Sequence, residues 1–313
     1  MNRKIIYELK GMYRDNFRVT GYEFGDGEKS VCIVGSSRGN EVQQLYCCSQ
    51  LVKKLKQLEE ERRIKEGHKI LVIPSINPYS MNIQKRFWPT DNTDINRMFP
   101  GYNLGETTQR IADGVFKVVS DYRYGIQFTS FYMPGEFVPH VRMMDAGYSS
   151  VEAAKKFGLP FVILRQVRPY DTATLNYNWQ IWNTQAFSLY TTTTTRIDRS
   201  GAGQALLAVL NFMAAQGIVK YSGPELMESR VLKDTDMISV RTAKSGIYEA
   251  LVRAGEEAAV GQPLANIVDP YDGEIMETLY APVDSRVFFM HSEPLTYANT
   301  AVIKLVRRRD CSP

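Results

Sequence analysis

The sequence predicts an α/β domain with a mainly parallel sheet, followed by a small all-β domain. Two patterns support this. Between residues 30 and 217, short apolar runs alternate with helical stretches, which is typical of a parallel sheet covered by helices. After Gly223-Pro224 the long helical stretches stop, and short alternating strands with turn signals continue to about residue 306. We therefore expect domains at 1–225 and 226–313.

The elements of the first domain are predicted from their apolar spacing. Apolar runs predict five buried strands, at 30–34, 69–73, 126–131, 161–164 and 186–189. Helical spacing predicts three helices, at 41–62, 107–122 and 200–216. Ligands bind at the carboxyl ends of strands in such sheets. The loops after Val34, Ile73, Phe128 and Leu189 are therefore where we expect a site.

The second domain contains a weak internal repeat. Residues 242–247 leading to 261–267 are similar to residues 281–287 leading to 300–303, about 39 residues later. Two similar β halves resemble the biotinyl/lipoyl hammerhead. No lysine lies in a recognisable modification tripeptide, so we favour a structural or oligomerisation module over a swinging-arm carrier.

Composition excludes several classes of function. There are 38 Lys and Arg against 34 Asp and Glu, a net charge of +4, and the two signs are interleaved, so no nucleic-acid partner is expected. No apolar run is long enough to span a membrane, and no secretory signal is expected. The cysteines, Cys32, Cys47, Cys48 and Cys311, indicate reduced thiols in a cytoplasmic protein.

Motifs occur in the expected loops. The first strand is followed by Gly35-Ser36-Ser37-Arg38-Gly39-Asn40-Glu41. Next come Ile76-Asn77-Pro78, then Arg86, and then a segment that reads D-I-N-R-M-F-P-G at 94–101. This arrangement resembles the succinylglutamate desuccinylase/aspartoacylase family, whose two loops read G-x-H-G-x-E and D-L-N-R-x-F-P-G.

The resemblance covers about residues 28 to 305 and has clear implications. It implies a zinc-carboxypeptidase-like α/β/α sandwich, with the β domain that accompanies one deacylase branch of the family. It also implies zinc-dependent hydrolysis of an amide in an N-acyl amino acid. In the family, zinc is held by the His and Glu of the first loop and by a later His in a strand reading D-L-H.

This chain departs from the family at those metal positions. They correspond to Arg38, Glu41 and Thr129. A zinc site needs three nitrogen, sulfur or carboxylate ligands, and a permanently charged guanidinium cannot be one of them. A threonine hydroxyl is a poor ligand. We therefore expect no zinc cofactor, and we expect Arg38 to form an ion pair with Glu41 across the former metal site.

The family's general base also has no counterpart. That glutamate lies in a strand reading approximately T-x-E-x-G, and the matching position here is Tyr190, within about one residue. His140 could approach the same cleft, but one histidine cannot replace two ligands. Glu41, Thr129 and Tyr190 remain the candidate catalytic residues.

The carboxylate-binding residues of the family are retained. Arg86, Asn96 and Arg97 match its substrate-binding positions, and Arg38 lies beside them. A guanidinium binds a carboxylate with two parallel hydrogen bonds. In the alternative interpretation, Arg97 only holds the loop by pairing with Glu41 or Asp94.

An aromatic segment between Arg165 and Arg196 allows two interpretations. It contains Tyr170, Tyr177, Trp179, Trp182 and Tyr190. These side chains either line a small-molecule pocket or pack in the core or at an interface.

Three functions are compatible with the sequence. In the first, the protein binds a carboxylate-bearing small molecule or peptide end without zinc-dependent hydrolysis. In the second, it is a metal-free enzyme in which Glu41 acts as acid or base and Tyr190 as proton donor. In the third, it is a zinc-dependent amide hydrolase acting on an N-acyl amino acid. A homo-oligomer is compatible with all three.

Overall fold

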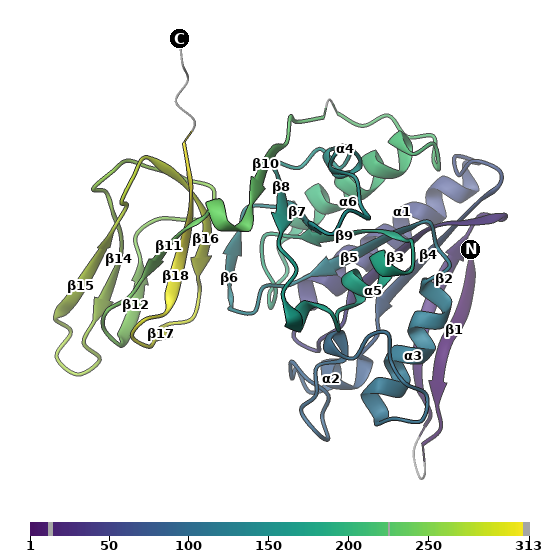
Figure 1. The fold of residues 1–313 in the computed structure, drawn as a ribbon, viewed down its shortest axis with the longest axis horizontal. Coiled ribbons are helices and arrows are strands. Elements are labelled where there is room, and N and C mark those ends of the chain that lie inside the picture. The colour runs from purple at the N-terminus through teal and green to yellow at the C-terminus, as the bar shows by residue number, and fades with distance from the viewer. Residues whose placement is uncertain (12–14, 225, 309–313) are drawn as a thin grey trace. The chain divides into compact units, whose positions relative to one another are not determined.

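A computed structural model describes residues 1–11, 15–224 and 226–308. These residues divide into two compact units (Figure 1). Unit 1 comprises Met1–Ser130 and Pro139–Val231, and unit 2 comprises Phe131–Val138 and the residues from Leu232 onward. The sequence assigned 131–138 to the first domain. That segment contains β6 (Gly135–Phe137), which pairs with β16 of unit 2 instead.

Nine strands of the described chain form one mixed sheet, in the order β1-β2-β4-β3-β5-β9-β7-β8-β10. In that order the strands span Asn2–Leu9, Phe17–Phe24, His68–Ser75, Glu28–Ser36, Tyr124–Thr129, Gln185–Tyr190, His140–Met144, Phe161–Arg165 and Arg230–Lys233. All five predicted strands are confirmed within a few residues.

The sheet contains both parallel and antiparallel strand pairs. Strands β4, β3, β5 and β9 run parallel to one another, and so do β7 and β8. The contacts β1-β2, β2-β4 and β7-β9 are antiparallel. Strands β1 and β2 were not predicted. Only seven residues connect them, too few for a parallel crossover.

Helices cover both faces of the sheet, as the α/β/α prediction requires (Figure 1). The α-helices are α1 (Val42–Glu60), α2 (Pro78–Asn82), α3 (Thr107–Val119), α4 (Val151–Lys155), α5 (Leu175–Ile181) and α6 (Arg199–Ala215). Short 3-10 helices are η1 (Ile95–Arg97), η2 (Pro169–Asp171) and, in unit 2, η3 (Asp234–Asp236). The three predicted helices correspond to α1, α3 and α6.

The alternation of side chains along β3 explains the two layers. Val31 and Ile33 point to the core beneath α1 and α6, whereas Cys32 and Val34 point to the core beneath α3 and α5. Both sets are fully buried, which is why the strand reads as one continuous apolar run.

The internal repeat of unit 2 is visible in its strand pairing. Strands β12 (Gly246–Ala250) and β14 (Pro263–Val268) pair antiparallel, as do β16 (Ser285–His291) and β18 (Ala301–Arg307). The short strand after β12, β13 (Glu257–Ala258), pairs with β16. The short strand after β16, β17 (Leu295–Thr296), pairs with β12 in return. Each half therefore lends a strand to the other.

Two further strands complete the sheets of unit 2. Strand β11 (Ile238–Arg241) pairs with β18, and β15 (Ile275–Tyr280) pairs with β14. Leu264, Ile267, Val287 and Val302 are fully buried in one common core with their neighbours.

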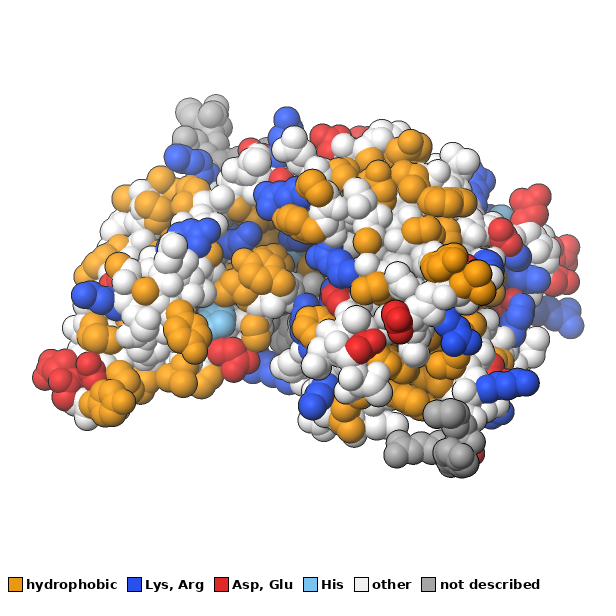
Figure 2. Space-filling view, turned by 60° about the horizontal axis from the view of Figure 1, so that its bottom comes forward, with side chains coloured by type: hydrophobic (Ala, Val, Ile, Leu, Met, Phe, Trp, Pro, Cys, Tyr) orange, Lys and Arg blue, Asp and Glu red, His pale blue; other side chains and the backbone are white. Residues whose placement is uncertain are grey.

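The surface carries charges of both signs. On the face shown in Figure 2, basic and acidic side chains are interspersed. Among the described residues, the helices are too short or too polar to cross a lipid bilayer.

Candidate functional site

The candidate site lies at the carboxyl ends of the central parallel strands. Strand β3 ends at Ser36 and leads through residues 37–41 into α1. Thr129 at the end of β5 and Tyr190 at the end of β9 lie opposite each other in the sheet. Parallel packing thus brings together residues that are far apart in the sequence.

Arg38 is clamped between two carboxylates. Its Nε and Nη2 donate to Asp94 Oδ2 at 3.1 and 2.8 Å, and its Nη1 donates to Glu41 Oε1 at 3.0 Å. Arg38 is only 5% exposed and Glu41 is fully buried. Burial opposes the charge, but the carboxylates of Glu41 and Asp94 raise the pKa of the guanidinium above its ordinary value. The expected Arg38–Glu41 ion pair is confirmed.

Hydrogen bonds surround the Glu41 carboxylate on all sides. Oε2 accepts from the backbone N–H groups of Ser37 at 2.8 Å and Arg38 at 3.0 Å, and from the Ser37 hydroxyl at 3.3 Å. Oε1 accepts from Arg38 and, at 2.6 Å, from the Ser130 hydroxyl. A carboxylate has about four lone-pair positions, so this one has no lone pair left for another partner.

A glycine allows this loop to pack closely. A Cβ atom on Gly39 would lie 2.2 Å from the carbonyl carbon of Ser80 and 2.3 Å from the carbonyl oxygen of Lys85. Gly39 N also donates to the carbonyl oxygen of Arg86 at 3.2 Å. Any larger residue would push apart the two loops that carry Arg38 and Arg86.

Asp94 continues the network toward Asn96. Its Oδ1 accepts from Asn96 N at 3.1 Å and so caps η1. Asn96 Oδ1 in turn accepts from Gln127 Nε2 at 2.8 Å, which anchors it to β5. Asn96 is therefore a fixed, mostly buried side chain at the edge of the site.

Arg97 does not join the buried cluster. It lies 3.7 Å from Asp171 Oδ1 and donates to the carbonyl oxygen of Tyr170, so the suggested pairing with Glu41 or Asp94 is wrong. Glu41 and Asp94 already pair with Arg38. Asp171, in η2, lies nearer to Arg97 and pairs with it instead. The Arg97 side chain remains 38% exposed.

The environment of Arg86 differs from those of Arg38 and Arg97. It is half-buried, and its guanidinium has no hydrogen bond or ion pair with any described residue. Its guanidinium carbon lies 5.6 Å from the centroid of the Phe87 ring. Burial lowers the pKa of Arg86, and the nearby charge of Arg38 lowers it further. Arg86 is thus a partly desolvated cation with unused donors.

Thr129 and Tyr190 occupy the remaining predicted positions. The Thr129 hydroxyl is buried without a hydrogen-bond partner among the described residues. The Tyr190 ring stacks on His140, with centroids 4.6 Å apart, and its hydroxyl accepts from Arg142 Nη1 at 3.2 Å. His140 therefore does approach this edge of the sheet, where it packs against Tyr190.

These side chains do not fit zinc. Arg38 is a cation, the lone pairs of Glu41 are occupied by hydrogen-bond donors, and Thr129 offers a neutral hydroxyl. Over residues 1–11, 15–224 and 226–308, no group of three or more His, Cys, Asp or Glu side chains is arranged to hold a metal ion.

The residues of the aromatic segment lie in several different places. Trp179 is fully buried in the core, and its Nε1 donates to the carbonyl oxygen of Val119 at 3.0 Å. Tyr170 lies against Arg97, and Tyr190 lies in the candidate site. Trp182 lies at the other edge of the sheet.

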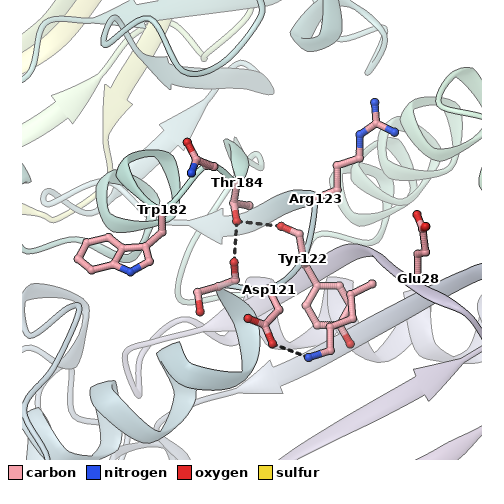
Figure 3. Close-up of a pocket in the computed structure, with 9 residues that line it drawn as sticks. Glu28, Asp121, Tyr122, Arg123, Trp182 and Thr184 are labelled. Atoms are coloured by element: carbon pink, nitrogen blue, oxygen red, sulfur yellow. Dashed lines mark hydrogen bonds and ion pairs between the residues drawn. The ribbon is translucent and has the colours of Figure 1, made fainter.

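At that other edge, Trp182 lines a surface pocket of about 490 Å³, with Lys29, Asp121 and Thr184 (Figure 3). This pocket lies by the amino ends of β3, β5 and β9, at the opposite ends of these strands from Arg38 and Thr129. Lys29 and Asp121 neutralise each other there at 2.6 Å.

Several residues of the site were missed in the sequence. Ser37 and Ser130 complete the contacts of Glu41, Gln127 holds Asn96, and Asp171 holds Arg97. Ser37 lies inside the quoted first loop, and Ser130 directly follows Thr129. Asp171 lies 74 positions after Arg97, and no local pattern connects the two.

Comparisons with known proteins identify relatives of the whole chain. A family model for the succinylglutamate desuccinylase/aspartoacylase catalytic domain matches residues 27–187. N-alpha-acetyl-L-2,4-diaminobutyric acid deacetylase from Halomonas elongata is 23% identical over 287 residues, which cover 86% of this chain and 77% of the relative.

Solved structures show the same fold. A succinylglutamate desuccinylase from a Silicibacter species has a TM-score of 0.82 at 17% identity, covering 98% of this chain and 95% of the other. A product-bound ectoine utilization protein from Ruegeria pomeroyi has a TM-score of 0.78 at 17% identity, covering 94% and 90%. The predicted fold, including the additional β domain, is confirmed by these similarities.

Proposed function

Because the chain belongs to the succinylglutamate desuccinylase/aspartoacylase family, we propose that it binds a small molecule or peptide end through a carboxylate. We further propose that it does so without zinc-dependent hydrolysis. The first part concerns Arg86, Asn96 and Arg97, and the second concerns Arg38, Glu41 and Thr129.

The state of Arg86 carries the proposal. A partly desolvated guanidinium without a hydrogen-bond partner has lost water without gaining an acceptor, which costs free energy. A ligand carboxylate would accept two parallel hydrogen bonds from it and restore that loss. No Asp or Glu side chain in the described part of the chain pairs with Arg86, and the nearby Asp94 and Glu41 already pair with Arg38.

Asn96 and Arg97 support the same ligand chemistry. Asn96 is held at a fixed position by Gln127, and the Arg97 side chain is 38% exposed and lies near enough to Arg86 to lower its pKa. In this proposal a carboxylate on Arg86 also interacts with the Arg97 guanidinium and the Asn96 side-chain amide.

The lack of zinc chemistry in this proposal is supported by the Glu41 contacts. Binding zinc through Glu41 would require breaking hydrogen bonds to Ser37, Arg38 and Ser130 and moving a buried cation aside. Such losses of charge-assisted hydrogen bonds are each worth about 1.5–3 kcal/mol.

We also propose a cellular location from the state of the cysteine thiols. Cys32, Cys47 and Cys48 are buried and form no disulfide. Reduced buried thiols are typical of a cytoplasmic protein, and we place the protein there.

Calorimetric titration with N-acetyl amino acids, succinate and glutarate tests the binding. We expect a ligand from this panel to bind the wild type, and Arg86→Gln to weaken it at least about tenfold through loss of a charged hydrogen-bond pair. Arg123→Gln is the matched control. Arg123 is an exposed arginine at the amino end of β5 and also lacks an ion pair among the described residues.

Other outcomes would support other functions. Equal binding by Arg86→Gln and wild type, or no binding at millimolar ligand, contradicts the proposal. Hydrolysis of an N-acyl amino acid that a chelator abolishes would support a zinc-dependent amide hydrolase. Hydrolysis that resists chelator but is lost in Glu41→Gln would support a metal-free enzyme.

A further inference from the structure

The buried cluster of Arg38, Glu41 and Asp94 has a role of its own, beyond ligand binding. We infer that the Arg38 guanidinium is the permanent cation of this site. It pairs with both carboxylates and positions the segment that carries Asn96, so each carboxylate has a cationic partner without a metal ion. This inference holds whatever ligand Arg86 binds.

The charges of the cluster require a cation. Glu41 is fully buried and the Asp94 side chain is 16% exposed, and both carboxylates face Arg38. Removing one partner of a buried ion pair leaves an uncompensated charge, which is among the most destabilising changes in a protein. Arg86 lies close enough to affect both carboxylates, but it forms no hydrogen bond with either.

The shape of the guanidinium matters as much as its charge. One side of the fork, Nε and Nη2, contacts Asp94, and Nη1 contacts Glu41. Asp94 lies 56 positions from Arg38, so this contact ties the loop after β3 to the start of η1. An ammonium group lacks the fixed fork needed to hold both carboxylates in this geometry.

The hydrogen bonds of Arg38 extend through Asp94 to Asn96, which is one of the proposed ligand-binding residues. Asp94 accepts from the backbone N–H of Asn96, and Asn96 accepts from Gln127. Arg38 is therefore a positioning residue for Asn96, acting through Asp94.

Thermal unfolding of the full chain tests the inference. We compare wild type, Arg38→Met and the charge-neutral triple variant Arg38→Met/Glu41→Gln/Asp94→Asn, each with chelator and with a slight excess of zinc. Metal content is measured on the purified wild type. Hydrogen exchange at the backbone N–H of Asn96 is measured in wild type and in Arg38→Lys.

The expected results separate a charge effect from simple loss of packing. Wild type should contain less than about 0.1 zinc per chain and keep its Tm within about 1 °C in chelator or zinc, because nothing binds to shift it. Arg38→Met should lose at least about 5 °C, and the triple variant should recover part of that loss because no buried charge is left unpaired. In Arg38→Lys, the backbone N–H of Asn96 should exchange at least about tenfold faster than in wild type. Its acceptor, Asp94 Oδ1, is then no longer held in place by the guanidinium.

Several results would overturn the inference. A tightly held zinc in wild type, or a Tm that falls in chelator, would show that a metal supplies the cation. A triple variant no more stable than Arg38→Met would show that packing alone is lost. If Arg38→Met does not fold, a folded triple variant supports the inference and an unfolded one contradicts it. Unchanged Asn96 exchange in Arg38→Lys would refute the positioning role.

Discussion

Two arginines at the same edge of the sheet have opposite environments. Arg38 is buried, and its guanidinium makes three hydrogen bonds to Asp94 and Glu41. Arg86, on the neighbouring loop, is half-buried and makes no hydrogen bond through its guanidinium to any described residue. Their backbones are linked through Gly39 N and the carbonyl oxygen of Arg86.

This difference separates structural groups from groups available to a ligand. A buried charge that pairs with the protein's own carboxylates, such as Arg38, contributes to the fold and is shielded from a ligand. A charge that is partly desolvated but unpaired is a place where a ligand gains the most from one contact. In the proposed function, the same residue type has two roles, set by the carboxylates around it.

Glu41→Gln should have the largest effect on the stability of the Arg38 cluster. The new amide would place N–H donors against the donors of Arg38, Ser37 or Ser130, and Arg38 would lose one of its two counter-ions. We expect a loss of about 3 kcal/mol in the free energy of unfolding, measured by urea denaturation.

Glu61→Gln provides the matched control for that variant. Glu61 pairs with Arg63 at 3.4 Å, but both side chains are more than a third exposed. Its loss should leave the free energy of unfolding nearly unchanged, because an exposed ion pair contributes little to stability. Equal effects of the two substitutions would mean that burial of the Arg38 cluster has no energetic consequence.

A smaller effect, of opposite sign, is expected from Thr129→Val. The Thr129 hydroxyl is buried without a partner among the described residues, so replacing it with a methyl group removes an unsatisfied polar group. We expect stability to stay equal or to rise by up to about 1 kcal/mol.

Thr184→Val is the counterpart with a satisfied hydroxyl. Thr184 Oγ1 lies 2.8 Å from the carbonyl oxygen of Tyr122, to which it donates, and this variant should lose about 1 kcal/mol. If Thr129 contacts the ligand, Thr129→Val will also weaken binding in the titration, while Thr184→Val will not. A destabilised Thr129→Val would show that its hydroxyl has a partner in solution.

The smallest expected effect concerns the buried thiols. Burial raises the pKa of Cys47 to about 12 and raises the pKa values of Cys32 and Cys48 well above their ordinary value. All three thiols therefore stay protonated at pH 8, and brief treatment of the native protein with iodoacetamide should leave them unlabelled in a peptide mass map.

Unfolding provides the control for the labelling. Cys32, Cys47 and Cys48 should all react in urea. Because the thiols lose their protons more easily in the unfolded chain, stability should fall as pH rises from about 9 toward 12. Rapid labelling of Cys47 in the native protein would show that the helix carrying it opens locally.

Much of the fold was predictable because it depends on local patterns. The five apolar runs and three helices of unit 1 follow from residue spacing, and the repeat of unit 2 corresponds to the exchange of β13 and β17 between its halves. The β1-β2 hairpin was missed because its residues are half exposed, so the apolar signal is weak. The segment 131–138 was assigned to the wrong unit because its partner, β16, lies some 150 positions later.

Only some residues of the candidate site, and few of their contacts, were predictable from the sequence. The motif at 94–101 identified Asn96 and Arg97, and the spacing of Arg38 and Glu41 within one loop indicated their ion pair. The partners of Arg97 and Glu41 outside that loop, Asp171 and Ser130, come from distant segments. No local spacing carries that information.

By itself, the sequence determined the α/β/α architecture, the family resemblance and the presence of Arg38 and Thr129 where the resembling motifs have histidines, because each is encoded in neighbouring residues. Only the tertiary structure decided that Asp94, and not Arg97, completes the Arg38 cluster, and that the Arg86 guanidinium has no hydrogen-bond partner among the described residues. The reason is physical: burial forces each charge to find a partner, and which partner is near enough depends on how the loops after β3, β4 and β5 meet.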